Sequence, residues 1–339
     1  MSDDYLWDGS GEPDPEVERL ERLLATLRSD RPAPELPENL GLRKRSVLFR
    51  HSIQLAVAAA AVVLVIAGWF LLRRERPSWE VVSLEGTPRI GSESISASGR
   101  LAVGQWLETD SSSRARISIG IIGEVHVDPN TRIRLLKAGA DDHRLALARG
   151  KMHAAIWAPP RLFSVETPSA VAVDLGCTYT LEVDEAGISL LHVTSGWVAF
   201  ETEGRESFVP AGALCKTRPG IGAGTPYRED ASEAFRLALT RLDFEERSAD
   251  GRLVALDAVL AQAEKEDAFT LWHLLSRVRA GERSRVFDRL QVLVPAPPGV
   301  TREGVARLDR QMLDRWWDEL GLEDTTWWRL WKGPAPSPK

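Results

Sequence analysis

Two cysteines have the clearest chemical potential in this chain of 339 residues. Cys177 lies in the alternating run DLGCTYT, and Cys215 lies in VPAGALCKTRPG. A thiol can be a nucleophile, a metal ligand, half of a disulfide, or simply a small buried hydrophobe. No C-x-x-C pair and no histidine–cysteine spacing typical of zinc accompanies them. We therefore expect neither a nucleophile nor a metal ligand, and the choice between a disulfide and buried thiols depends on the compartment.

Histidines and carboxylates gather in the same part of the chain and could form a metal site or a hydrolytic pair. Half-exposed histidines are common at alternating strand positions, so we expect no metal site. Paired carboxylates can hydrolyse glycosides, but nothing in the sequence fixes their spacing. Phosphate-loop, G-x-S-x-G and H-E-x-x-H motifs are absent, so we predict no cofactor and no enzymatic activity. The residues considered are His126, His143, His153, His192, Glu166, Asp174, Glu182 and Asp184.

Tryptophan is unusually frequent, with 12 copies in the chain. Those near the C-terminus could form an aromatic surface for a carbohydrate or a partner protein. More often such residues cap the core of a small helical domain. Both interpretations stay open for Trp316, Trp317, Trp327, Trp328 and Trp331.

One apolar segment determines where these residues can lie. Residues 53–72 read IQLAVAAAAVVLVIAGWFLL, with Gln54 as the only strongly polar member. A helix of this length spans about 30 Å, the thickness of a bilayer core. Arg73 and Arg74 follow where a signal peptide would have small residues. We predict a retained transmembrane helix, and the flanking basic residues weakly favour a cytoplasmic N-terminus.

Residues 1–50 precede this span as an arm, of which residues 1–41 are acidic. Within DPEVERLERLLATLRSD, apolar residues recur at helical spacing and form one stripe. A lone short helix is marginal in water, so the stripe must pack on something. The membrane surface, a second copy or the groove of a partner protein would each serve. The stripe consists of Val17, Leu20, Leu23, Leu24 and Leu27.

Two different patterns follow the span. Residues 79–227 contain short alternating runs such as RARISIG and ISLLHVTSGWVAF, separated by turn residues. This pattern indicates a mainly β domain of sandwich, barrel or solenoid type. Residues 228–333 carry apolar residues at helical spacing, with a break at SADG, and predict an α-helical C-terminal domain. We expect residues 334–339 to be a disordered tail.

The β region resembles a FecR domain. GRLAVGQWLETDSSSRARISI resembles the opening pattern of that family, and LALARGKMHAAI resembles its L..G.v...v turn. RLFSVETPSAVAVDLGCTYTLEV resembles its most specific stretch, and LLHVTSGWVAF and VPAGAL resemble its closing pieces. Cys177 and Tyr179 stand where the family usually has threonine after glycine and then phenylalanine. The Trp-rich cytoplasmic segment of classical members is absent, and only Trp7 precedes the span.

The resemblance implies a single-pass bacterial inner-membrane regulator, with a cytoplasmic N-terminus and periplasmic C-terminal domains. It implies an extracytoplasmic-function sigma factor as the partner of the arm, so that release changes transcription. The net charge of −6 gives no sign of direct nucleic-acid binding. In the oxidising periplasm we expect a disulfide between Cys177 and Cys215, with two buried thiols as the alternative.

A second function of a different class stays open. The chain would then be an envelope-anchored binding or scaffold protein, whose β domain binds cell-wall glycan or an envelope protein. The arm would be only a tether in that case, and its leucine stripe would have no partner to hold.

Overall fold

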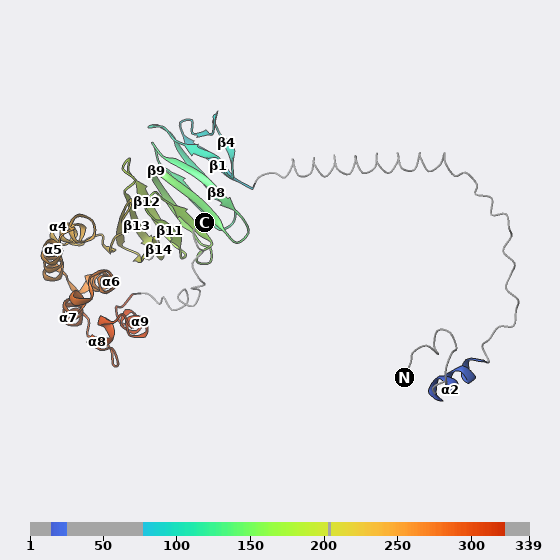
Figure 1. Ribbon diagram of the computed structural model, residues 1–339. Helices are drawn as coiled ribbons and strands as arrows, with labels where there is room; N and C mark the ends of the chain where they lie inside the picture. The colour runs from blue at the N-terminus through green and yellow to red at the C-terminus, as the bar shows by residue number, and fades with distance from the viewer. Residues whose placement is uncertain (1–14, 26–76, 203–204, 323–339) are drawn as a thin grey trace. The chain divides into compact units, whose positions relative to one another are not determined.

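The structure is a computed structural model that describes residues 15–25, 77–202 and 205–322 (Figure 1). The chain divides into two units, Met1–Arg73 and Arg74–Lys339, which are described separately. The transmembrane helix predicted over 53–72 and the tail predicted over 334–339 lie outside the described residues. Among the residues that are described, no helix has the length and apolar character needed to cross a membrane.

Helix α2 (Pro15–Leu24) lies in the first unit and confirms that the arm contains a helix. Proline suits the first helical position, and Glu16 and Glu18 suit the positive end of the helix dipole. Glu18 also forms an ion pair with Arg22 one turn later, at 3.4 Å.

The strands of the second unit form two sheets, each of which uses β9 (His143–Ile156). Sheet A contains, in spatial order, β4 (Ser98–Ala102), β1 (Ser78–Glu85), β6 (Arg114–Ile119), β7 (Gly123–Val127), β9, β12 (Thr178–Val183), β13 (Ser189–Ser195) and β16 (Ala213–Arg218), and β16 also pairs with β17 (Gly222–Ala223) and β18 (Tyr227–Arg228). Sheet B contains β3 (Glu93–Ser94), β2 (Arg89–Ile90), β5 (Trp106–Glu108), β8 (Arg132–Ala138), β9, β10 (Phe163–Glu166), β11 (Val171–Asp174), β14 (Trp197–Thr202) and β15 (Arg205–Pro210).

Strand β9 changes sheet at its middle. Residues 143–149 pair with β8 in sheet B, and residues 150–155 pair with β12 in sheet A. Gly150 lies at the change with φ of +89°, and a Cβ there would collide with the backbone of Thr131. Glycine is therefore required by both conformation and space. The turn that the resemblance suggests for LALARGKMHAAI is wrong, because this segment is one continuous bent strand.

Alternation along the strands explains the core. In β6 and β7 every second side chain is buried, including Ile117 and Val125, which are fully covered. This period of two means that each sheet presents one apolar face to the interior. The expectation of a mainly β domain is confirmed by this arrangement.

Helices follow the last strand, as expected. They are α4 (Glu233–Thr240), the π-helical turn η2 (Arg241–Glu245), α5 (Ala249–Gln262), α6 (Ala268–Arg277), α7 (Arg283–Leu293), α8 (Arg302–Ala306) and α9 (Arg310–Asp318), with short 3₁₀ turns η3 (Lys265–Asp267) and η4 (Ala280–Glu282). Ser232, Ser248 and Asp309 cap α4, α5 and α9 by accepting a backbone N–H bond. Ser248 belongs to the SADG sequence predicted to separate two helices.

The helical region packs directly against the β region. Phe269 and Trp317 belong to the same buried cluster as the strand residues. Trp317 contacts Trp197 of β14 at a ring separation of 5.9 Å and Trp272 of α6 at 4.6 Å. Trp316 and Trp317 are 0% and 2% exposed, so both are core residues rather than a ligand surface. Trp327, Trp328 and Trp331 lie outside the described residues.

Candidate functional site

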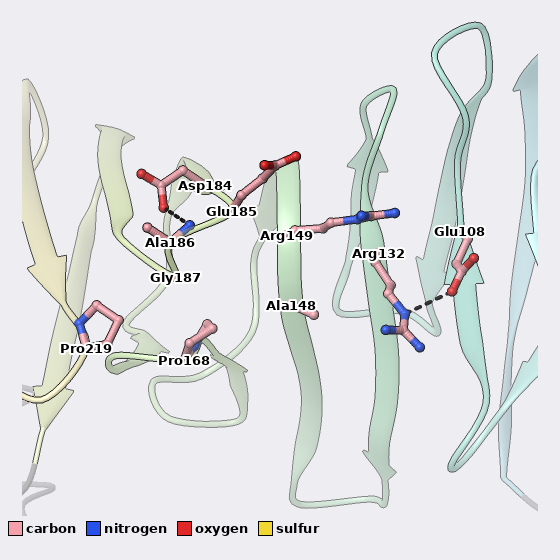
Figure 2. A pocket seen from close by; sticks show the side chains of 10 residues that line it. All are labelled: Glu108, Arg132, Ala148, Arg149, Pro168, Asp184, Glu185, Ala186, Gly187 and Pro219. Atoms are coloured by element: carbon pink, nitrogen blue, oxygen red, sulfur yellow. Dashed lines mark hydrogen bonds and ion pairs between the residues drawn. The ribbon is translucent and has the colours of Figure 1, made fainter.

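An open groove of about 660 Å³ lies where β9 leaves sheet B (Figure 2). Its floor includes Ala148 and Arg149 of β9, and the turn at 184–187 between β12 and β13 forms one side. Pro168 and Pro219 contribute from two further turns. The groove exists because β10 pairs with β9 only as far as Ala146, and β12 pairs with it only from Gly150 onward.

The charges of the groove are only partly paired with one another. Arg132 donates to Glu108 at 2.9 Å and stacks over the ring of Trp106 at 4.1 Å. Figure 2 shows Arg149 between Arg132 and the turn that carries Glu185. Within the described ranges, neither Arg149 nor Glu185 forms an ion pair of 4.0 Å or less. The groove can therefore offer one guanidinium and one carboxylate to a polar ligand.

Asp184 has a structural role at the edge of this groove. Its Oδ1 accepts hydrogen bonds from the backbone N–H groups of Ala186 and Ile188, both at 2.9 Å. These bonds fix the turn between β12 and β13 in the manner of an Asx turn. The carboxylate is thus used to shape the groove wall.

The disulfide expected between Cys177 and Cys215 is wrong, because both are free and buried thiols. Cys215 lies opposite Leu191 of β13, and Leu191 lies opposite Leu181 of β12. The two cysteines are therefore separated by two strand spacings, about 10 Å, and by four residues along the strand direction, about 13 Å. A disulfide needs Cα atoms closer than about 7 Å. The alternative of two small buried hydrophobes describes both residues.

Cys177 instead forms a buried polar cluster with Asp174. The thiol donates to Asp174 Oδ2 at 2.6 Å, and Gly176 N–H donates to Oδ1 at 2.7 Å. Burial raises the pKa of Asp174 to about 7, although both hydrogen bonds lower it. Burial also raises the pKa of the Cys177 thiol well above its usual value, so the thiol is not an activated nucleophile. Among the described residues, the hydroxyl of Tyr179 has no hydrogen-bond partner.

His126 of β7 and His153 of β9 are cross-strand neighbours, but each of the four histidines of the β region has its own polar or ring contact. His153 lies 2.9 Å from both Thr180 Oγ1 and Asp128 Oδ2, and His192 lies 2.6 Å from Glu229. His126 lies 3.1 Å from Glu124, and His143 packs on the ring of Trp79. Within the part of the chain that is described, no group of three or more metal-ligating side chains converges.

The other considered carboxylates are also dispersed. Glu166 pairs with Arg144 at 3.3 Å, and Glu182 pairs with Lys151 at 3.9 Å. These ion pairs are partly exposed, so they stabilise the fold only weakly. Of the four considered carboxylates, Asp184 alone lines one of the two cavities found among the described residues. Within that part of the chain, no two of the four therefore lie in one cavity.

Sequence reasoning missed His273 and Arg277, which join the helices to sheet B. Both lie on α6, four residues apart, and therefore on the same helix face. The backbone N–H of Phe208 in β15 donates to His273 Nε2 at 3.1 Å, while Nδ1 donates to Phe269 O at 2.8 Å. Burial lowers the pKa of His273 to about 3, so the ring is neutral. Two polar residues at this spacing in the apolar helix LWHLLSRV were the available signal.

Part of the β region is similar to a known protein family. Residues 105–199 match the model of the FecR protein family, which confirms the resemblance expected from the sequence. Two crystal structures of a putative anti-sigma factor from Parabacteroides distasonis ATCC 8503, at 1.65 and 2.50 Å resolution, are also similar to this chain. Each is 15% identical with a TM-score of 0.33, and the match covers 40% of this chain and 64% of the solved chain. The match thus spans less than two thirds of those chains, and no curated protein matches this one.

Proposed function

We propose that this protein, whose residues 105–199 match the FecR family, is a FecR-type regulator that holds an extracytoplasmic-function sigma factor through its N-terminal arm. The family match is the observation that carries this proposal. FecR proteins are regulatory, and the groove described above presents no nucleophile–base pair of the kind that hydrolases use. The proposed role is one of binding and release.

Helix α2 supports the arm as the partner-binding element. The side chains of Leu20, Leu23 and Leu24 are 57%, 66% and 57% exposed. Burying a leucine side chain fully contributes about 1.5–3 kcal/mol, so a groove that covered these residues would gain substantial affinity. A helix of 10 residues is also marginal on its own, and such a partner would stabilise it. Val17 lies in the same helix, and Leu27 lies outside the described residues.

The proposed topology follows from the apolar segment at 53–72. We propose that this segment crosses the bacterial inner membrane, with the arm in the cytoplasm and the β and helical regions in the periplasm. The groove beside β9 then faces the envelope, and Arg149 and Glu185 make it suitable for a polar envelope ligand. Binding there would be the signal that changes the hold of the arm on its partner.

Co-purification from the source cells tests the partner. The full chain, tagged at its C-terminus, is cross-linked in cells and purified, and the retained proteins are identified by mass spectrometry. The variant Leu20→Asp/Leu24→Asp should lose a retained sigma factor more than tenfold, since each change removes an apolar contact and adds a charge. Transcription from the promoters of that sigma factor should change in parallel.

A control variant separates loss of the stripe from loss of the helix. Arg22→Asp breaks the ion pair with Glu18 and places like charges one turn apart, which destabilises the helix slightly. Arg22 lies on the face opposite the leucines, so the control should retain the sigma factor. If wild type, control and stripe variant retain the same proteins, the arm is a tether and the regulator proposal is wrong. The scaffold function, with the groove as its binding site, would then replace it.

A further inference from the structure

A second, much smaller cavity lies between sheet B and the helices. Its volume is about 20 Å³, which is room for a single occupant the size of a water molecule. Strand β15 contributes Arg205, α5 contributes Arg252, and α6 contributes Leu274 and Arg277. Asp243 of η2 completes the polar lining. The cavity thus touches four elements that come from both regions of the second unit.

Positive charge dominates the lining of this cavity. Three guanidinium groups face one carboxylate, and that carboxylate is already occupied by Thr225. The backbone N–H of Thr225 donates to Asp243 Oδ2 at 2.6 Å, and its hydroxyl donates to Oδ1 at 3.0 Å. Asp243 therefore offsets only part of the charge of the three arginines.

The hydrogen bonds of the three guanidiniums go to neutral oxygen atoms. Arg205 donates to Ala223 O at 3.2 Å, and Arg252 donates to Leu242 O at 3.0 Å. Arg277 donates to Thr225 Oγ1 at 2.9 Å and to Ser207 Oγ at 2.6 Å. These bonds satisfy donors but add no negative charge, so Asp243 remains the one carboxylate among the lining residues. Buried cations with incomplete counter-charge destabilise a fold, and burial lowers the pKa of Arg277 although Asp243 raises it.

We propose that this cavity binds one small monovalent anion of the chloride class. The positive lining selects an anion over a cation, and the volume excludes polyatomic anions such as sulfate or phosphate. The three arginines are only partly buried, so the ion can exchange with solvent. Because its ligands come from β15, α5 and α6, the anion holds the helices to sheet B. This inference is independent of the proposed regulatory function.

Thermal unfolding of the purified full chain tests the site. Melting temperatures are compared in sodium chloride and in sodium gluconate at equal ionic strength, because gluconate is too large for the cavity. Wild type should melt higher in chloride, by about 3 °C for each tenfold increase above the dissociation constant. Arg252→Gln should lose this difference. Arg236→Gln removes an exposed arginine of α4 outside the cavity and should keep it.

A direct measurement keeps the proposal testable if Arg252→Gln fails to fold. Crystals of the wild type grown in bromide should show an anomalous peak among Arg205, Arg252 and Arg277. Equal melting temperatures of the wild type in the two salts, or a bromide map without a peak there, would overturn the proposal. The cavity would then hold water only.

Discussion

Replacing Asp174 with asparagine should remove one large contribution to the pH dependence of stability, the one that comes from this buried carboxyl group. Asp174 is the last residue of β11 and is only 1% exposed. Its partners are a backbone N–H and a thiol, and neither carries a positive charge. Asparagine has the same shape and can still accept the bond from Gly176, but it cannot ionise. The substitution therefore isolates the ionisation of one buried carboxyl group.

The magnitude follows from the pKa in the two states. The pKa of Asp174 is about 7 in the folded protein and has its ordinary value of 3.8 in the unfolded chain. Between these values the folded state keeps a proton that the unfolded state has released. The free energy of unfolding must therefore fall as the pH rises from about 4 to about 7 and level off above that range. At 1.36 kcal/mol for each pH unit, the total loss is about 4 kcal/mol.

Urea unfolding of the full chain between pH 4.5 and 8.5 measures this effect. The difference in unfolding free energy between wild type and Asp174→Asn should change by about 3 kcal/mol between pH 4.5 and 7, because part of the titration range lies below pH 4.5. Glu93→Gln removes an exposed carboxylate and should keep the wild-type profile. Parallel profiles for wild type and Asp174→Asn would refute the reasoning, since the carboxyl would then titrate alike in both states.

Three further predictions concern packing and cysteine chemistry. Gly150→Ala should lower the unfolding free energy by about 2 kcal/mol or more, because the new Cβ meets the backbone of Thr131 at a positive φ. The control Gly91→Ala has a positive φ but open space around it, so it should lower the unfolding free energy by less. Trp317→Ala should cost about 3–5 kcal/mol in urea unfolding, whereas Trp157→Ala, at a side chain 65% exposed, should cost far less. Non-reducing mass spectrometry should find no peptide joining Cys177 to Cys215, and both thiols should alkylate only after unfolding.

Each of these measurements has an outcome that contradicts its argument. Equal losses for the two glycine variants would show that space at Thr131 is unimportant. Equal losses for the two tryptophan variants would place Trp317 outside the core. A linked peptide from native protein would require β12 and β16 to be closer than their pairing through β13 allows.

Local patterns in the sequence predicted the class of each region. The period of two in RARISIG and the turns around it led to the β region, and helical spacing of leucines led to α2. Ser248 marked the start of α5 because a serine cap acts within one turn of the helix. These properties depend on neighbours in the chain, which is why they could be read without a structure.

Features that depend on strand order could not be read in this way. The spacing of Cys177 and Cys215 along the chain says nothing about β13 lying between their strands. The groove at Arg149 arises from where β10 ends relative to β12, and the cationic cavity arises from the docking of α6 on β15. Each of these is a tertiary contact between residues far apart in sequence. The family match concerns residues 105–199 and so does not reach Arg205, Arg252 or Arg277.

The double membership of β9 has a consequence for how the chain folds. Its hydrogen-bonded neighbours β7 and β8 precede it, whereas β10 and β12 follow it. During synthesis, neither sheet can extend past its N-terminal strands until β9 has emerged. Since one strand supplies the continuation of both, the two sheets should then nucleate together and melt in a single cooperative transition. A one-residue slip of β9 would misplace side chains in both sheets at once. Correct folding of the whole β region therefore depends on the register of this one strand.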